Sequence, residues 1–161
     1  MGTALACRHL NDGIWYDEAY TLWFFALSPR SALTDFHLPN NHPFFSLCLY
    51  LWQWAYGSNV FMLRLLPFFC WLAAIHLSAR AASRLGGARF GLLTGMVLMF
   101  SHPFVNYSCQ LRGYIMAAAF FAAAMDTAIA HRLAPSRRLL ALFALYQALG
   151  SAVLPTQALF A

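Results

Sequence analysis

Charged residues are scarce in this chain, and lysine is absent. Only 9% of the 161 residues are charged and 61% are hydrophobic, whereas soluble domains are about 25% charged. This composition excludes an ordinary soluble domain and predicts a membrane protein. The net charge of +5 does not indicate nucleic-acid binding, because most arginines fall between apolar runs, where membrane topology explains them. The lack of lysine beside abundant alanine and leucine suggests a GC-rich coding sequence, hence a bacterium.

Acidic residues and metal-type clusters are equally sparse. The chain has five acids, and its cysteines are far apart, without the spacing of a metal or redox site. His37 and His42 lie five residues apart with Asp35 nearby, which is too loose a pattern to predict a zinc site. We therefore predict no metal and no cofactor, and leave a divalent metal open.

Four apolar runs are suited to crossing a bilayer, each near the ~20 residues that a membrane helix needs. They are residues 60–78, 88–105, 114–131 and 139–160. Arginine clusters separate the first run from the second and the third from the fourth, as is typical of cytoplasmic loops. We therefore predict an all-α, polytopic membrane protein with four transmembrane helices. Residues 1–161 form a single partial transmembrane domain, in which 60–161 hold these helices and 1–59 form an outer loop.

The apolar stretch 43–56 is too short to span a bilayer. Its tryptophans and tyrosines suit the headgroup level, so we predict a juxtamembrane helix along the outer face. His42 and Pro43 would open it, with proline in its first turn. The polar segment before it has no apolar helix ahead that would export it, and the chain ends directly after an apolar run. We therefore expect a piece of a larger membrane protein.

Asp17 and Glu18 open a predicted helix over residues 18–27. A structural role would suffice for Asp17, because an aspartate at an N-cap accepts backbone N–H groups. The alternative is a general base at the membrane surface that deprotonates an acceptor hydroxyl or amine.

Arg112 and Tyr114 precede the third predicted span on its outer side. Both residue types anchor helices at the interface, but a guanidinium also matches the geometry of a lipid phosphate. Arg64, one turn inside its span, is a second candidate for the contact with a lipid phosphate. His42 either joins the loop to the helix or lies beside a phosphate or a sugar hydroxyl. Asp126 lies near the opposite face, where we expect it to pair with an arginine.

The order of these motifs resembles the N-terminal part of GT-C glycosyltransferases, most closely the protein-mannosyltransferase and aminoarabinose-transferase type. The motifs are Trp15-Tyr16-Asp17-Glu18-Ala19, His42-Pro43 opening an apolar helix that ends at Gly57, Arg64-Leu65-Leu66-Pro67, and Arg112-Gly113-Tyr114. The resemblance runs from about Ile14 to His131. Phe44 departs from it, since the family has a second proline there, and the family has a transmembrane helix ahead of its Asp-Glu loop.

The resemblance implies an enzyme that moves a sugar from a polyprenyl-phosphate donor to a lipid, glycan or protein acceptor. The reaction would take place at the extracytoplasmic face of the bacterial inner membrane, among membrane lipids and without nucleic acid. Asp17 would be the general base with Glu18 as its companion, and His42, Arg112 and Tyr114 would lie at the donor phosphate. A fragment of such an enzyme is expected to lack part of the donor cavity.

The competing hypothesis is a non-enzymatic polytopic protein, such as a transporter or assembly fragment. It needs Asp17 only as a helix cap and Arg112 only as an anchor. Geometry separates the two hypotheses, because the enzyme requires both side chains to face one outer cavity. The sugar, the acceptor and the length of the carrier are not specified by the sequence.

Overall fold

All regular elements in the described part of the chain are helices, as predicted. The computed structural model describes residues 7, 9–10, 12–37 and 41–154. Two helices are long and apolar enough to cross a membrane, Val60–Phe100 and Tyr114–Leu133. By length and composition the structure therefore supports membrane-spanning helices, and two helices meet this criterion where four were predicted.

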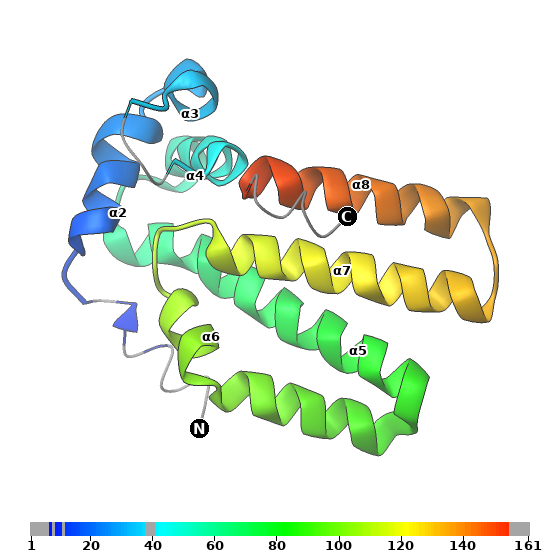
Figure 1. Ribbon diagram of the computed structural model, residues 1–161. Coiled ribbons are helices and arrows are strands. Elements are labelled where there is room, and N and C mark those ends of the chain that lie inside the picture. The colour runs from blue at the N-terminus through cyan, green and yellow to red at the C-terminus, as the bar shows by residue number, and fades with distance from the viewer. Residues whose placement is uncertain (1–6, 8, 11, 38–40, 155–161) are drawn as a thin grey trace.

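The helix α5 (Val60–Phe100) is a hairpin of two antiparallel arms (Figure 1). The break is at Gly87, whose φ of 80° lies in a region that side-chain-bearing residues rarely adopt. The arms, residues 60–86 and 88–100, correspond to the first two predicted spans. The first arm is longer than predicted, so Arg80 and Arg84 lie on a helix and their expected place in a loop is wrong.

The second predicted span is divided at its far end. The arm ends at Phe100, Ser101 is extended, and α6 (His102–Tyr107) begins with a proline in its first turn. Ser101 is the N-cap of α6, and Pro103 suits the first turn of the new helix because it needs no N–H partner there. The predicted continuous helix to residue 105 is therefore replaced by a short arm and a separate turn of helix.

The helices α7 (Tyr114–Leu133) and α8 (Arg137–Val153) complete the elongated body of the molecule. In Figure 1, α7 lies between α5 and α8, and it packs against both. α7 agrees with the predicted span. α8 begins two residues before its predicted start and ends at Val153, where Leu154 is extended, so the predicted continuous helix to residue 160 is wrong.

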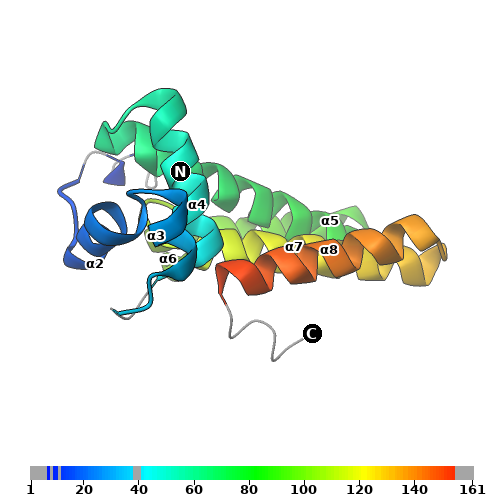
Figure 2. The ribbon, with the colours of Figure 1, turned by 90° about the horizontal axis from the view of Figure 1, so that it is seen from above.

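Four short elements gather at one end of this body (Figures 1 and 2). They are α2 (Tyr16–Tyr20), the π-helix η1 (Thr21–Phe25), α3 (Pro29–Thr34) and α4 (Pro43–Tyr56). The predicted helix over 18–27 is thus an α-turn that widens into a π-helix, a rare form frequent at functional sites. α4 has its predicted bounds, opening at His42 and Pro43, and Figure 2 shows it crossing the end of the body.

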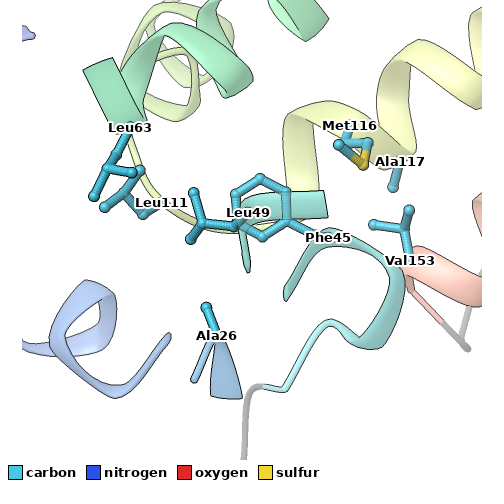
Figure 3. Close-up of a cluster of buried hydrophobic side chains, with 8 residues drawn as sticks. All are labelled: Ala26, Phe45, Leu49, Leu63, Leu111, Met116, Ala117 and Val153. Carbon is cyan, nitrogen blue, oxygen red and sulfur yellow. The ribbon is translucent and has the colours of Figure 1, made fainter. Parts of the chain in front are cut away.

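A buried apolar cluster joins this end to the long helices. Phe45 and Leu49 of α4 meet Leu111, in the loop before α7, and Val153 of α8. Figure 3 shows the same cluster with Ala26, Leu63, Met116 and Ala117. Because burial of large apolar side chains contributes ~1.5–3 kcal/mol each, this cluster fixes α4 and the loop before α7 in place.

Candidate functional site

Asp17 and Arg112 form an ion pair at the end of the molecule that carries α2 and α4. The Nη1 of Arg112 donates to Oδ2 of Asp17 at 2.7 Å. The Asp17 side chain is 45% exposed and that of Arg112 is 13% exposed, so the carboxylate is accessible while the guanidinium is largely enclosed. Asp17 is not the N-cap of its helix, which is Trp15; the capping interpretation is therefore wrong.

Tyr114 holds the other side of the Arg112 guanidinium. Its hydroxyl accepts a hydrogen bond from Arg112 Nη2 at 3.0 Å, and the guanidinium carbon lies 4.7 Å from the centre of its ring. Tyr107 packs on the same ring at 5.1 Å between ring centres. The guanidinium is thus oriented by a hydrogen bond, an ion pair and a cation–π contact.

His42 makes an edge-to-face contact with Tyr114, with 4.8 Å between the ring centres. It is 4% exposed, and neither ring nitrogen has a hydrogen-bond partner among the described residues. Burial, reinforced by the charge of Arg112, lowers the pKa of His42 from 6.5 to about 4. The nearby backbone of Val153 has a smaller and opposite effect and raises the pKa, although it does not form a hydrogen bond with the ring. The imidazole is therefore neutral at physiological pH and is unpaired beside a cation.

Gly113 permits this approach. A Cβ on Gly113 would lie 2.8 Å from both His42 Cβ and Val153 Cγ1, closer than packed atoms allow. The Arg-Gly-Tyr string was noted in the sequence for its arginine and tyrosine alone. Gly113 and Tyr107 were missed, because nothing in their local pattern indicates which distant side chain they meet.

Glu18 and Arg64 form a second ion pair that is fully enclosed. Arg64 Nη2 donates to Glu18 Oε2 at 2.8 Å, and both side chains are 1% exposed. Arg64 also donates to carbonyl oxygens of the preceding loop, those of His9, Leu10, Asp12 and Gly13. The Glu18 carboxylate accepts from the backbone N–H groups of Trp15 and Leu111. This pair fastens the loop that carries Asp17 to α5 and to the start of α7.

The sequence candidates therefore fall into two groups. Asp17, His42, Arg112 and Tyr114 lie together, and Asp17 reaches the surface. Glu18 and Arg64 are buried behind them and contact each other. Arg64 Nε has no partner among the described residues, but the rest of the guanidinium is occupied by protein oxygens.

Asp126 lies elsewhere, at the far end of the long helices. It accepts hydrogen bonds from Arg80 and Arg84 of α5. The predicted pairing of Asp126 with an arginine is therefore confirmed. An apolar groove of about 500 Å³ reaches this cluster from between α5, α7 and α8. None of the residues that line it belongs to the Asp17–Arg112 group.

Within the described ranges, no group of three or more His, Cys, Asp or Glu side chains could hold a metal ion. His37 pairs with Asp35, whereas His42 is buried against Tyr114, so the two histidines do not share a site.

No protein-family model, curated protein or solved structure matches this chain.

Proposed function

We propose that this chain is part of a membrane glycosyltransferase that takes a sugar from a polyprenyl-phosphate donor. One observation carries the proposal: the half-exposed carboxylate of Asp17 lies 2.7 Å from the oriented guanidinium of Arg112. A base and a phosphate-type cation are thus side by side, although 95 residues separate them in sequence. This contact supports the enzyme hypothesis, which requires both side chains to face one outer cavity.

In this proposal the Asp17–Arg112 ion pair is the resting form of the site. The donor phosphodiester brings two non-bridging oxygens, which share one negative charge, to Arg112 and competes with Asp17 for the same N–H groups. The carboxylate released in this way is free to act as a base. Arg112 remains held by Tyr114, so the phosphate is received by a guanidinium that is already oriented.

The transfer step would be a direct displacement with inversion. Asp17 accepts the proton of an acceptor hydroxyl or amine as its oxygen or nitrogen bonds to the anomeric carbon. The bond from that carbon to the phosphate oxygen breaks, and polyprenyl phosphate leaves with the added negative charge facing Arg112. The ring nitrogens of His42 are enclosed, so in this proposal a ring N–H of His42 reaches a phosphate oxygen or a sugar hydroxyl only once the donor has opened the site.

Glu18 and Arg64 act as positioning residues in this mechanism. Their enclosure leaves no exposed oxygen on Glu18 for an acceptor, and Arg64 is engaged by backbone carbonyls. The phosphate role suggested for Arg64 by its sequence position is therefore not part of the proposal. The pair instead holds α2 so that Asp17 faces Arg112.

We further propose that the chain is polytopic in a bacterial inner membrane, with the Asp17 end outward. The bend of α5 and the α7–α8 loop lie at the other end of the body (Figure 1), and arginines flank both, as expected of a cytoplasmic side. α4, crossing the outer end, would lie along the interface. A non-enzymatic membrane protein is the second candidate, because the closed Asp17–Arg112 pair could serve stability alone.

The variant Asp17→Asn distinguishes the glycosyltransferase from the non-enzymatic membrane protein. In vesicles that contain the full-length protein, a polyprenyl-phosphate sugar and an acceptor alcohol or amine, transfer should fall by ~10²-fold or more, as loss of a general base predicts. Binding of polyprenyl phosphate should be retained or strengthened, because Arg112 loses its competitor. Arg112→Gln should weaken that binding, and Asp35→Asn, at the same end of the molecule, should change neither.

Unchanged transfer in Asp17→Asn would exclude the base. Unchanged carrier binding in Arg112→Gln would exclude the phosphate role and favour the non-enzymatic alternative.

A further inference from the structure

An apolar groove runs along the long helices, away from the Asp17–Arg112 site. Its volume is about 500 Å³, within the ~300–1,000 Å³ range of ligand pockets. It lies between the first arm of α5, α7 and α8, and its walls include Leu66, Phe69, Leu77, Phe120 and Leu142. The groove opens along the body of the molecule, where a membrane protein would meet acyl chains.

The groove ends at a cluster of two arginines and one aspartate. Arg80 donates to Asp126 Oδ2 from Nη2 at 2.6 Å and from Nε at 3.1 Å, and Arg84 Nε donates to Oδ1 at 2.9 Å. Asp126 is 2% exposed, whereas Arg80 and Arg84 are 46% and 36% exposed. One buried carboxylate therefore orients two guanidiniums whose outer parts remain accessible.

These guanidiniums retain donors for a ligand. In the described part of the chain, Arg80 Nη1 and both Nη atoms of Arg84 have no hydrogen-bond partner. The cluster carries a formal charge of +1, since two arginines face one aspartate. Arginine nitrogens in this arrangement match the oxygens of a phosphate.

The surrounding end of the molecule is strongly basic. Arg89 follows the bend of α5, Arg132 lies in the last turn of α7, and Arg137 and Arg138 open α8. Asp126 is the only acid of the described residues beyond α4. Such a surface is complementary to an anionic leaflet, whose negative potential attracts juxtamembrane arginines.

The groove also has the length of a lipid chain. Leu66 and Arg80 both line it and are 14 positions apart on one helix, or ~21 Å at 1.5 Å per residue. One leaflet of the hydrocarbon core is ~15 Å thick. A chain anchored at Arg80 and Arg84 would therefore lie within the groove through its own leaflet.

We propose that this groove binds an anionic phospholipid of the leaflet at the α7–α8 loop. Its phosphate contacts Arg84 and Arg80, and one acyl chain lies between α5, α7 and α8. Asp126 is a positioning residue that holds the two guanidiniums at the mouth. The site rests on the membrane placement proposed above, but it is independent of sugar transfer.

The test uses the full chain purified in a mild detergent. Native mass spectrometry and thermal unfolding measure the binding of phosphatidylglycerol, phosphatidylcholine and inorganic phosphate. Phosphatidylglycerol should be retained and raise the midpoint of unfolding, since a ligand that binds the folded state stabilises it. Phosphatidylcholine and inorganic phosphate should be retained less than phosphatidylglycerol and should raise the midpoint of unfolding less.

Two variants address the two parts of the ligand. Arg84→Gln should weaken phosphatidylglycerol binding by about tenfold or more, whereas Arg137→Gln, an equal charge change outside the groove, should leave it unchanged. Ala73→Phe places a ring on an exposed position of the groove wall and should displace the chain. Ala144→Phe, an exposed position of α8 outside the lining, is its control.

Three results would overturn the proposal. Equal binding of phosphatidylcholine, whose phosphate is neutralised by its own choline group, would indicate that the groove does not select an anionic phospholipid. Equal binding of inorganic phosphate would indicate an anion site without a lipid chain. An equal loss in Arg84→Gln and Arg137→Gln would indicate general surface charge.

Discussion

At the scale of single residues, the end that carries Asp17 contains two ion pairs with different exposure. The Glu18–Arg64 pair is enclosed and surrounded by backbone partners, so removing either member would leave a buried charge or several unpaired oxygens. The Asp17–Arg112 pair is half open to solvent. Only the second pair can exchange partners with a ligand at low cost.

His42 leads to a prediction on pH. Its folded pKa of about 4 lies below its ordinary 6.5, so the unfolded chain binds the proton more readily between these values. The contribution of His42 to the unfolding free energy should therefore be fully present above pH 6.5. It should be lost as pH drops toward 4, and the loss is about 3 kcal/mol at most. His42→Phe keeps a ring against Tyr114 but cannot titrate.

The measurement is the unfolding free energy of both proteins in detergent from pH 7 to pH 4. The wild type should lose more stability over this range than His42→Phe, while His102→Phe, at an exposed histidine, should follow the wild type. Identical pH slopes in wild type and His42→Phe would show that the buried imidazole does not titrate as argued.

The sequence indicated which residues would form the site better than how they meet. Asp17, Arg112, Tyr114 and His42 were expected on one side, because each lies beside an end of a predicted helix that faces that side. The direct Asp17–Arg112 contact could not be derived in this way. It depends on a loop fixed by Arg64, whose bonds to backbone carbonyls leave no pattern in the sequence.

At the scale of elements, helices were predicted well where an apolar run and a turn-forming residue coincide. α4 is bounded by Pro43 and Gly57, and α7 begins directly after Gly113. The hairpin of α5 was predicted less well, because the arginines near its bend were taken for a loop. Helix-favouring residues such as Ala81 and Ala82 carry the helix on to Gly87, where the backbone changes direction.

Gly87 is therefore expected to be essential to the hairpin. Its φ of 80° and ψ of 177° lie in a region almost exclusive to glycine. A side chain there would meet no atom within 4 Å, so any cost of Gly87→Ala comes from the backbone and not from crowding. We expect a loss of ~1–3 kcal/mol in unfolding free energy.

Gly13→Ala is the matched control, because this glycine also has open space around it but no positive φ. It should change stability by less than ~0.5 kcal/mol. Denaturant unfolding of the two variants in detergent measures the difference. Equal stability would mean that the bend does not depend on the conformation of Gly87.

At the scale of the whole molecule, charge is divided between the two ends. Asp12, Asp17, Glu18 and Asp35 lie at the end with α2–α4, where the described arginines are Arg30, Arg64 and Arg112. The other end carries six arginines and Asp126 alone, the arginines being Arg80, Arg84, Arg89, Arg132, Arg137 and Arg138. The sequence predicted this division, because it depends on the order of apolar runs and not on side-chain contacts.

This asymmetry predicts the orientation of the chain in a membrane. Arginine-rich connections stay on the cytoplasmic side, and acidic residues contribute little to orientation. In intact bacterial cells, a membrane-impermeant maleimide should therefore label the exposed Cys7, at the Asp17 end. A cysteine introduced as Ser136→Cys, in the α7–α8 connection, should be labelled only after the cells are permeabilised.

Labelling of the denatured protein controls for thiol reactivity, and Ser136→Cys in a chain whose four cysteines are replaced by alanine isolates the second site. The reverse pattern would place the Asp17–Arg112 site in the cytoplasm, where an extracytoplasmic transfer could not occur. It would also move the groove at Arg80 and Arg84 to the outer leaflet. Because lipid binding in detergent does not depend on orientation, that result would refute the proposed transferase topology and leave the phospholipid site open to its own test.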